Sequence, residues 1–123
     1  MAYAQGYPEK PVRMVAPYPP GGTSDIIARI LGQKLFDAWG QQIVVDNRAG
    51  AGGTIGSGQV AKSPADGYTL LLGSSGTVTN APAVYKNISY DPVKDLTAIG
   101  PIQSTPLVIT AALKTPISNY KEL

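Results

Sequence analysis

Three polar, glycine-rich segments hold the residues of this sequence that are best suited to binding a ligand. They are Pro17–Ser24, Arg48–Thr54 and Gly73–Thr77. Glycine allows backbone N–H groups to come close to a ligand, and neighbouring hydroxyl groups can donate hydrogen bonds to a carboxylate or a phosphate. The hydroxyl groups belong to Thr23, Ser24, Thr54, Ser74, Ser75 and Thr77. This pattern indicates recognition of a small anion by uncharged donors.

The same segments also have a purely structural interpretation. Glycines form tight turns, and hydroxyl residues cap helices. Arg48 could face an anion, but an arginine in this position more often pairs with an acid such as Asp46 or Asp25. Tyr18 lies in the first segment and could form one wall of a site. From the residues alone, both interpretations stay open.

The composition argues against several classes of function. The 123 residues include no histidine and no cysteine, which removes histidine-based acid–base catalysis, thiol chemistry and the commonest metal ligand. The net charge is only +2 and the basic residues are scattered, so we expect no nucleic-acid partner. The segment Gly50–Gly56 departs by one position from the dinucleotide-binding fingerprint, and no phosphate-binding loop is present. We therefore expect no cofactor and no metal.

Alternating strands and helices must position the three segments. Val12–Ala16, Ile43–Val45 and Tyr68–Leu72 are short apolar runs that predict strands. Apolar residues at helical spacing predict a helix from Thr23, as N-cap, to Trp39 on the apolar face, with Gly40 as the glycine that ends it. Thr54 is expected to cap a second helix that runs to about Lys62, and its glycines suggest close packing.

The later part of the chain is less regular. A short helix is expected near Ala81–Tyr85 and a helical turn at Asp91–Asp95. Leu96–Gln103 and Leu107–Leu113 are predicted as further strands. Near the end, Asn119 could cap a helix with Glu122 three residues later.

The repeated strand–loop–helix order predicts right-handed units with parallel strands. Each glycine-rich segment follows the carboxyl end of a strand, and such ends meet at one edge of an open sheet, where ligands bind. We therefore expect the three segments to lie together. We also expect that Gly22 and Gly53 allow the backbone to approach a carboxylate, with positive φ angles that favour glycine.

Several motifs, taken in order, resemble a known receptor family. They are Tyr7–Arg13, Pro17–Asp25, Val45–Gly56, Ala61–Gly73 and Tyr90–Leu96. Together they strongly resemble the Bug-type receptors, the extracytoplasmic solute-binding proteins of tripartite tricarboxylate transporters. The resemblance covers nearly the whole chain from Tyr7.

The resemblance implies an α/β fold like that of periplasmic binding proteins (type II-like), an open sheet with flanking helices and two lobes around a cleft. It implies a small carboxylate as ligand and membrane transporter subunits as partners. It places three loops against the ligand carboxylate, partly through backbone N–H groups. With the loops themselves, it predicts a site made of Tyr18, Pro20, Gly21, Gly22, Thr23, Ser24, Asp25, Gly52, Gly53, Thr54, Ser74, Ser75, Gly76 and Thr77.

Members of this family are substantially longer than 123 residues. We therefore interpret residues 1–6 as a residual signal or cloning segment, residues 7–100 as the N-terminal part of an incomplete first lobe, and residues 101–123 as the crossover toward a second lobe. Ala2-Tyr3-Ala4 has the form left by signal peptidase, and a chance tripeptide is an equally good interpretation of these residues alone. Together with the resemblance, it predicts a periplasmic protein exported with a cleaved signal peptide.

Two other classes of function remain as alternatives. One is a small α/β enzyme that acts on an anionic substrate, although the missing histidine and cysteine count against it. The other is an interaction domain without a ligand. Because the apolar run Leu107–Leu113 would need a partner, we also predict that the chain forms a homodimer, with possible exchange of Leu96–Leu113.

Overall fold

A three-stranded parallel sheet forms the centre of the molecule. The computed structural model describes residues 6–106, 108–112, 114–116 and 119–122. Strands β1 (Val12–Ala16), β2 (Ile43–Asn47) and β3 (Thr69–Leu71) pair in the order β2-β1-β3. Both pairings are parallel. The prediction of three neighbouring parallel strands is confirmed.

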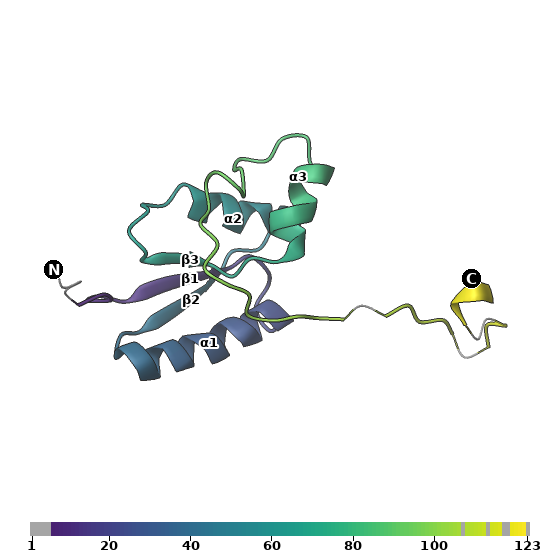
Figure 1. Ribbon diagram of the computed structural model, residues 1–123, viewed down its shortest axis with the longest axis horizontal. Helices are drawn as coiled ribbons and strands as arrows, with labels where there is room; N and C mark the ends of the chain where they lie inside the picture. The colour runs from purple at the N-terminus through teal and green to yellow at the C-terminus, as the bar shows by residue number, and fades with distance from the viewer. Residues whose placement is uncertain (1–5, 107, 113, 117–118, 123) are drawn as a thin grey trace.

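The crossover helices cover the two faces of this sheet. Helix α1 (Thr23–Trp39) joins β1 to β2 on one face, and helix α2 (Thr54–Ala61) joins β2 to β3 on the other (Figure 1). Because β1 is the central strand, it is covered on both faces, and its residues Val12, Val15 and Ala16 have no exposed surface. The result is a three-layer α/β unit, as predicted.

Helix α1 ends where the sequence predicts but begins one residue differently. Gly40 adopts a left-handed conformation (φ 68°), and its amide donates to the Phe36 carbonyl at 2.8 Å. The N-cap is Gly22 rather than Thr23, and no side chain caps the helix. The expected capping by Thr23 is therefore wrong, since its side chain already belongs to the first turn.

The main apolar core lies between α1 and the sheet. Met14, Ala16, Ala28 and Leu72 form its buried centre. Partly buried apolar residues surround them: Ile27, Leu31, Leu35, Ile43, Val45 and Leu70. This packing holds the N-terminus of α1 beside the carboxyl end of β1.

Helix α2 lies very close to the loops that precede it. A Cβ on Gly56 would be 2.6 Å from the Arg48 carbonyl oxygen, and Gly58 faces the Ser89 side chain. The predicted close packing of these glycines is confirmed. Thr54 does not cap the helix, because the N-cap is Gly53 and the Thr54 hydroxyl donates to the Ala51 carbonyl at 2.9 Å.

Beyond β3 the chain forms a wide helical turn, η2 (Gly76–Asn80), in which the Ala81 amide donates to the Gly76 carbonyl. Helix α3 (Ala81–Val84) follows directly, close to the short helix expected there. The turn predicted at Asp91–Asp95 is also present, with the Asp95 amide 2.8 Å from the Asp91 carbonyl oxygen.

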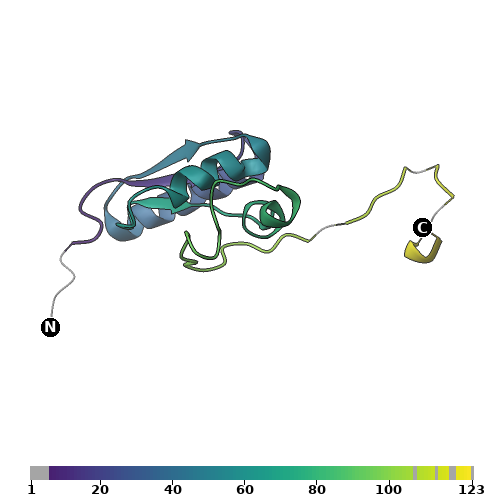
Figure 2. The same cartoon turned by 90° about the horizontal axis from the view of Figure 1, so that it is seen from above.

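The two later strands predicted from the sequence are wrong. Residues 96–103 and 108–112 form no strand, while Leu107 and Leu113 lie outside the described residues. Val108 and Ile109 are each 80% exposed, because no described strand is available to pair with them. The end of the chain extends away from the sheet and helices in both views (Figures 1 and 2).

A single turn, η3 (Tyr120–Glu122), lies at the end of this segment. The backbone amide of Lys121 in this turn donates to the Asn119 side-chain oxygen at 3.0 Å. The predicted cap is therefore confirmed for one turn. The predicted signal remnant Ala2-Tyr3-Ala4 lies outside the described residues.

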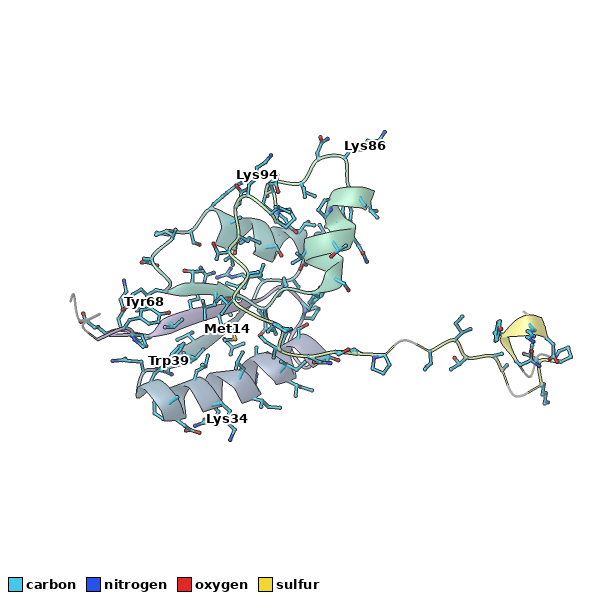
Figure 3. All side chains as sticks on the ribbon, viewed as in Figure 1. Met14, Lys34, Trp39, Tyr68, Lys86 and Lys94 are labelled. Carbon is cyan, nitrogen blue, oxygen red and sulfur yellow. The ribbon has the colours of Figure 1, made fainter. Side chains whose placement is uncertain are left out.

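Trp39, which the sequence places on the apolar face of α1, does not belong to the core. It is 37% exposed, and its ring contacts Tyr7 at 5.8 Å between centroids. Tyr7 also packs against Tyr68, and Trp39 and Tyr68 lie toward the amino ends of the strands (Figure 3). Among the described residues, no helix has the length and apolar character needed to cross a membrane.

Candidate functional site

The three glycine-rich loops meet at the carboxyl edge of the sheet. The Tyr18 and Ser74 hydroxyl groups share a hydrogen bond of 2.8 Å, which joins the loops after β1 and β3. The Asn47 side chain, at the end of β2, donates from its Nδ2 to the Tyr18 carbonyl at 3.2 Å. The predicted convergence is confirmed, and we call this region the three-loop edge.

Tyr18 occupies the centre of the three-loop edge. A Cβ on Gly76 would lie 2.9 Å from the Tyr18 Oη, and one on Gly53 would lie 3.3 Å from its Cζ. The tyrosine ring therefore fills space that only glycine leaves open on the other two loops. This explains why two loops distant in sequence both carry glycine beside Tyr18.

The loop after β2 needs glycine for its backbone conformation as well. Gly50, Gly52 and Gly53 have φ angles of 135°, 65° and 93°, and Ala51 between them has a φ of 46°. These angles belong to the region that side chains disfavour. The loop contains the short turn η1 (Ala51–Gly53), closed by a hydrogen bond of 2.9 Å from the Gly53 amide to the Gly50 carbonyl. The expectation of a positive φ is confirmed at Gly53 but wrong at Gly22, whose φ is −80°.

Uncapped backbone amides are available at this edge. The N-terminus of α1 has no side-chain cap, and the amides of Thr23 and Ser24 donate to none of the described residues. The Gly52 amide likewise has no acceptor among the described residues. Free N–H groups at a helix N-terminus, with the positive end of the helix dipole, favour an anion.

Asp25, in the first turn of α1, shapes the loop before the helix. It is buried, accepts a hydrogen bond from the Gly21 amide at 2.9 Å, and pairs with Arg29 at 2.9 Å. The hydrogen bond from Arg29, followed by that from Gly21, keeps the pKa of the Asp25 carboxyl below its ordinary value. Because Arg29 balances its charge, Asp25 can hold the loop without cancelling the attraction of the helix N-terminus for an anion.

Arg48 is engaged away from the free amides. Its Nε lies 2.9 Å from the Asp46 carboxylate, which Arg13 also contacts at 2.6 Å. Burial raises the pKa of the Asp46 carboxyl. The hydrogen bonds from Arg13 and Arg48 lower this pKa by more than burial raises it, so the net shift is downward. The structural interpretation of Arg48 is therefore the one observed, and the donors at the edge are uncharged.

The predicted site residues fall into an accessible set and a buried set. Asp25, Gly53 and Thr77 are buried. Thr77 accepts from the Ser74 amide and donates to the Ser74 carbonyl, so its hydroxyl is used within its own loop. The other predicted residues are at least partly exposed at the three-loop edge: Tyr18, Pro20, Gly21, Gly22, Thr23, Ser24, Gly52, Thr54, Ser74, Ser75 and Gly76.

A hollow of about 230 Å³ adjoins these loops. It is lined by Gly52, Gly76, Asn80, Ala81, Val84 and Tyr85. The two glycines were predicted from the sequence as site residues, whereas the other four were not. In the sequence, these four residues belong to the short helix expected after the third loop or stand next to it. A short helix does not by itself predict a binding role.

Comparison with known proteins adds a decisive observation. Residues 27–123 match the family described as "Tripartite tricarboxylate transporter family receptor". The chain belongs to this receptor family. The match covers most of the chain, and it confirms the resemblance carried by the ordered motifs.

Individual relatives agree with the family assignment. The chain is 42% identical over 121 residues to the protein BugT of Bordetella pertussis, a match that covers 98% of this chain and 37% of BugT. A protein encoded between two genes in Agrobacterium vitis is 43% identical over 110 residues, covering 89% of this chain and 32% of that protein. The chain thus spans about a third of the length of these relatives.

Solved structures of receptors in this family share the fold. The periplasmic binding protein BugD is 46% identical, with a TM-score of 0.69 over 72% of this chain and 29% of BugD. MatC from Rhodopseudomonas palustris, solved with bound malate, is 38% identical, with a TM-score of 0.68 over 72% of this chain and 30% of MatC. A third structure, from R. palustris with adipate, is 41% identical, with a TM-score of 0.69 over 71% of this chain and 29% of that chain. The predicted likeness to periplasmic binding proteins is confirmed.

Proposed function

We propose that the intact protein containing this chain is an extracytoplasmic solute-binding receptor for a small carboxylate. The observation that carries the proposal is the convergence of three loops around uncapped amides at the N-terminus of α1. A carboxylate placed there would accept hydrogen bonds from uncharged donors and would lie at the positive end of the helix dipole. The solved relatives with malate and adipate support a carboxylate as the ligand class.

In this proposal, each loop has a distinct role. The amides of Thr23, Ser24 and Gly52 bind the carboxylate, together with the accessible hydroxyl groups of Ser74 and Ser75. Tyr18 and Gly53 determine how closely the loops approach one another. Thr77 and Asp25 position these groups, since the Thr77 hydroxyl bonds within its own loop and one Asp25 carboxylate oxygen accepts hydrogen bonds from Gly21 and Arg29. The remaining predicted residues, Pro20, Gly21, Gly22, Thr54 and Gly76, form the surrounding backbone.

The proposed setting follows from the family. The protein would act in the periplasm after removal of a signal peptide and would deliver its ligand to membrane transporter subunits. We propose no catalysis, because a receptor needs only to bind and release its ligand. The described residues contain no group of three acidic, histidine or cysteine side chains that could hold a metal.

Isothermal titration of the intact protein with a panel of carboxylates tests this proposal. Butyrate, succinate, malate, glutarate and adipate form the panel, and the matched amide succinamide serves as the ligand control. We expect saturable binding of at least one acid and none of the amide. Gly53→Val should abolish that binding, whereas Lys34→Ala, an exposed change on α1, should leave it unchanged. Absence of binding to every acid, or turnover of an acid that binds, would contradict the proposal.

A further inference from the structure

We infer that the hollow beside the three-loop edge receives the carbon chain of the bound carboxylate, and that the Tyr85 hydroxyl hydrogen-bonds to a polar group on that chain. This inference rests on the proposed function and extends it, because it assigns ligand selectivity to residues of this chain. The class of ligand indicated is a short aliphatic carboxylate with a second carboxylate or a hydroxyl group.

The hollow is continuous with the proposed carboxylate site. Gly52 and Gly76 line it, and both glycines belong to the loops that form the three-loop edge. The Gly52 amide is one of the donors without an acceptor among the described residues. A ligand whose carboxylate is bound by this amide therefore has its carbon chain at the opening of the hollow.

The size and lining of the hollow suit a short carbon chain. Its volume of about 230 Å³ is below the range of about 300–1,000 Å³ that is usual for larger ligands. Ala81, Val84 and the ring of Tyr85 provide an apolar wall on one side. A methylene chain gains free energy by leaving water at such a surface.

Tyr85 lies directly over the loop that holds Gly52. A Cβ on Gly52 would be 3.0 Å from the Tyr85 Oη and 3.8 Å from ring carbons. Because Gly52 has no side chain and a positive φ, the Tyr85 hydroxyl can lie close to the backbone of the second loop. The hydroxyl therefore stands beside the path of a ligand that is bound at that backbone.

Two polar groups in the hollow are available to a ligand. Within residues 6–106 and the other described segments, no residue forms a hydrogen bond with the Tyr85 hydroxyl or with the Asn80 side-chain amide. Tyr85 is 45% exposed, so a ligand that enters the hollow can reach its side chain and hydrogen-bond to its hydroxyl. Such groups in a mainly apolar hollow provide selectivity for a polar substituent.

The wide turn η2 explains how these residues reach the hollow. Gly76 begins the turn, and Asn80 ends it, with Ala81 hydrogen-bonded back to Gly76. All three residues line the hollow. Wide helical turns of this kind are rare and occur frequently at functional sites. The turn presents Asn80 to the hollow and starts the helix that carries Val84 and Tyr85.

Two variants of the intact protein test the inference by titration with butyrate, succinate and adipate. Tyr85→Phe keeps the ring and removes the hydroxyl. It should weaken succinate binding about fivefold, which corresponds to one lost hydrogen bond, and leave butyrate binding within about twofold. Val84→Trp narrows the hollow at a residue that is 71% exposed. It should weaken adipate binding about tenfold or more, because adipate has the longer carbon chain. It should weaken succinate binding by a smaller factor.

Controls separate this inference from the proposed function. Lys86→Ala is the matched neighbouring change and should alter no affinity. Circular dichroism checks that each variant is folded. If the unmodified protein binds none of the acids, the proposed function fails. If it binds them but Tyr85→Phe and Val84→Trp leave the affinities unchanged, or lower all of them equally, the inference about the hollow is overturned while the proposed function stands.

Discussion

Gly53 is the residue at which all three loops come together. A Cβ at this position would lie 2.6 Å from the Thr77 Cγ2 and 3.3 Å from both the Pro17 carbonyl oxygen and the Tyr18 ring. Its φ of 93° also disfavours any side chain. One residue therefore meets both a steric and a conformational requirement of the three-loop edge.

Replacement of Gly53 by valine should remove carboxylate binding and lower the free energy of unfolding. We expect a loss of about 2 kcal/mol or more, because the backbone conformation is strained and the neighbours must move. Chemical denaturation followed by circular dichroism measures the stability, and titration measures the binding.

Gly22→Ala is the matched control for Gly53→Val. Its φ is −80°, and a Cβ there would meet only the Pro19 carbonyl oxygen, at 3.5 Å. The free energy of unfolding of this variant should fall by no more than about 1 kcal/mol, because the only cost is the preference for glycine over alanine at the N-cap. Equal destabilisation by the two changes would show that the geometry at Gly53 is not the cause.

Asp25 should make the stability of the protein sensitive to acid. Its pKa in the folded state lies below the ordinary value of 3.8, chiefly because Arg29 and then the Gly21 amide hydrogen-bond to the carboxylate. A depressed pKa contributes stability that is fully present above the unfolded-state pKa and is lost as the pH falls through the folded-state value.

Asp25→Asn tests this contribution by thermal unfolding between pH 2 and pH 7, a range chosen to span the transition. The difference in melting temperature between the unmodified protein and the variant should be largest at neutral pH and should shrink below about pH 4. A difference that stays constant across this range would mean that the charge on Asp25 does not contribute.

At the scale of elements, the two crossover helices use glycine for different reasons. Gly56 of α2 lies against the loop after β2, and its Cβ would be 2.6 Å from the Arg48 carbonyl oxygen and 3.1 Å from Pro17. Gly32 of α1 faces β2, and its Cβ would make ordinary contacts of 3.4 Å and 3.9 Å with Ile43 and Val45. The first glycine is needed for close approach, and the second is not.

Alanine at these two positions should therefore have opposite effects. Gly32→Ala should stabilise the protein by up to about 1 kcal/mol through helix propensity. Gly56→Ala should destabilise it by about 1–3 kcal/mol, because overpacking outweighs the same gain in propensity. Denaturant titrations of both variants provide the measurement. Stabilisation by Gly56→Ala would contradict the close packing of α2 on the loops.

Sequence reasoning succeeded for elements whose apolar pattern matches local packing. The spacing of apolar residues placed α1 to within one residue, and β1 was predicted with its observed ends. It failed for Leu96–Gln103 and Leu107–Leu113, which have apolar strand composition but no partner strand among the described residues. A strand needs neighbours for its backbone hydrogen bonds, and composition does not supply them.

For the whole molecule, exposed apolar side chains are the most unusual feature. Val93, Ile99, Val108 and Ile109 are between 80% and 86% exposed. They belong to the part of the chain after α3 that carries no regular strand or helix. The end of that part leads away from the sheet (Figure 1). Such side chains favour association when they come together on one surface.

We predict that the 123-residue chain self-associates as a homodimer through this apolar segment. The net charge of +2 is too small to oppose association by repulsion. Sedimentation velocity at several concentrations should show a dimer that increases with concentration. Ile99→Lys together with Ile109→Lys should shift the chain toward monomer, whereas Lys34→Ala should not. A monomer at every concentration would contradict the prediction.

The sequence by itself determined the order of the strands and helices, the three glycine-rich loops and their common edge. These features depend on apolar periodicity and on turn residues, which act over short distances, and on the right-handed crossover rule. The ordered motifs also indicated the receptor family, and the comparisons confirm it.

Only the tertiary structure decided which atoms at that edge remain available. Thr77 and Asp25 looked like ligand donors or acceptors, yet their polar groups are engaged by Ser74, Gly21 and Arg29. The hollow beside Tyr85 likewise depends on how η2 and α3 pack against the second loop. Hydrogen-bond partners and cavities arise between segments that are distant in sequence, so residue type and spacing along the chain do not determine them.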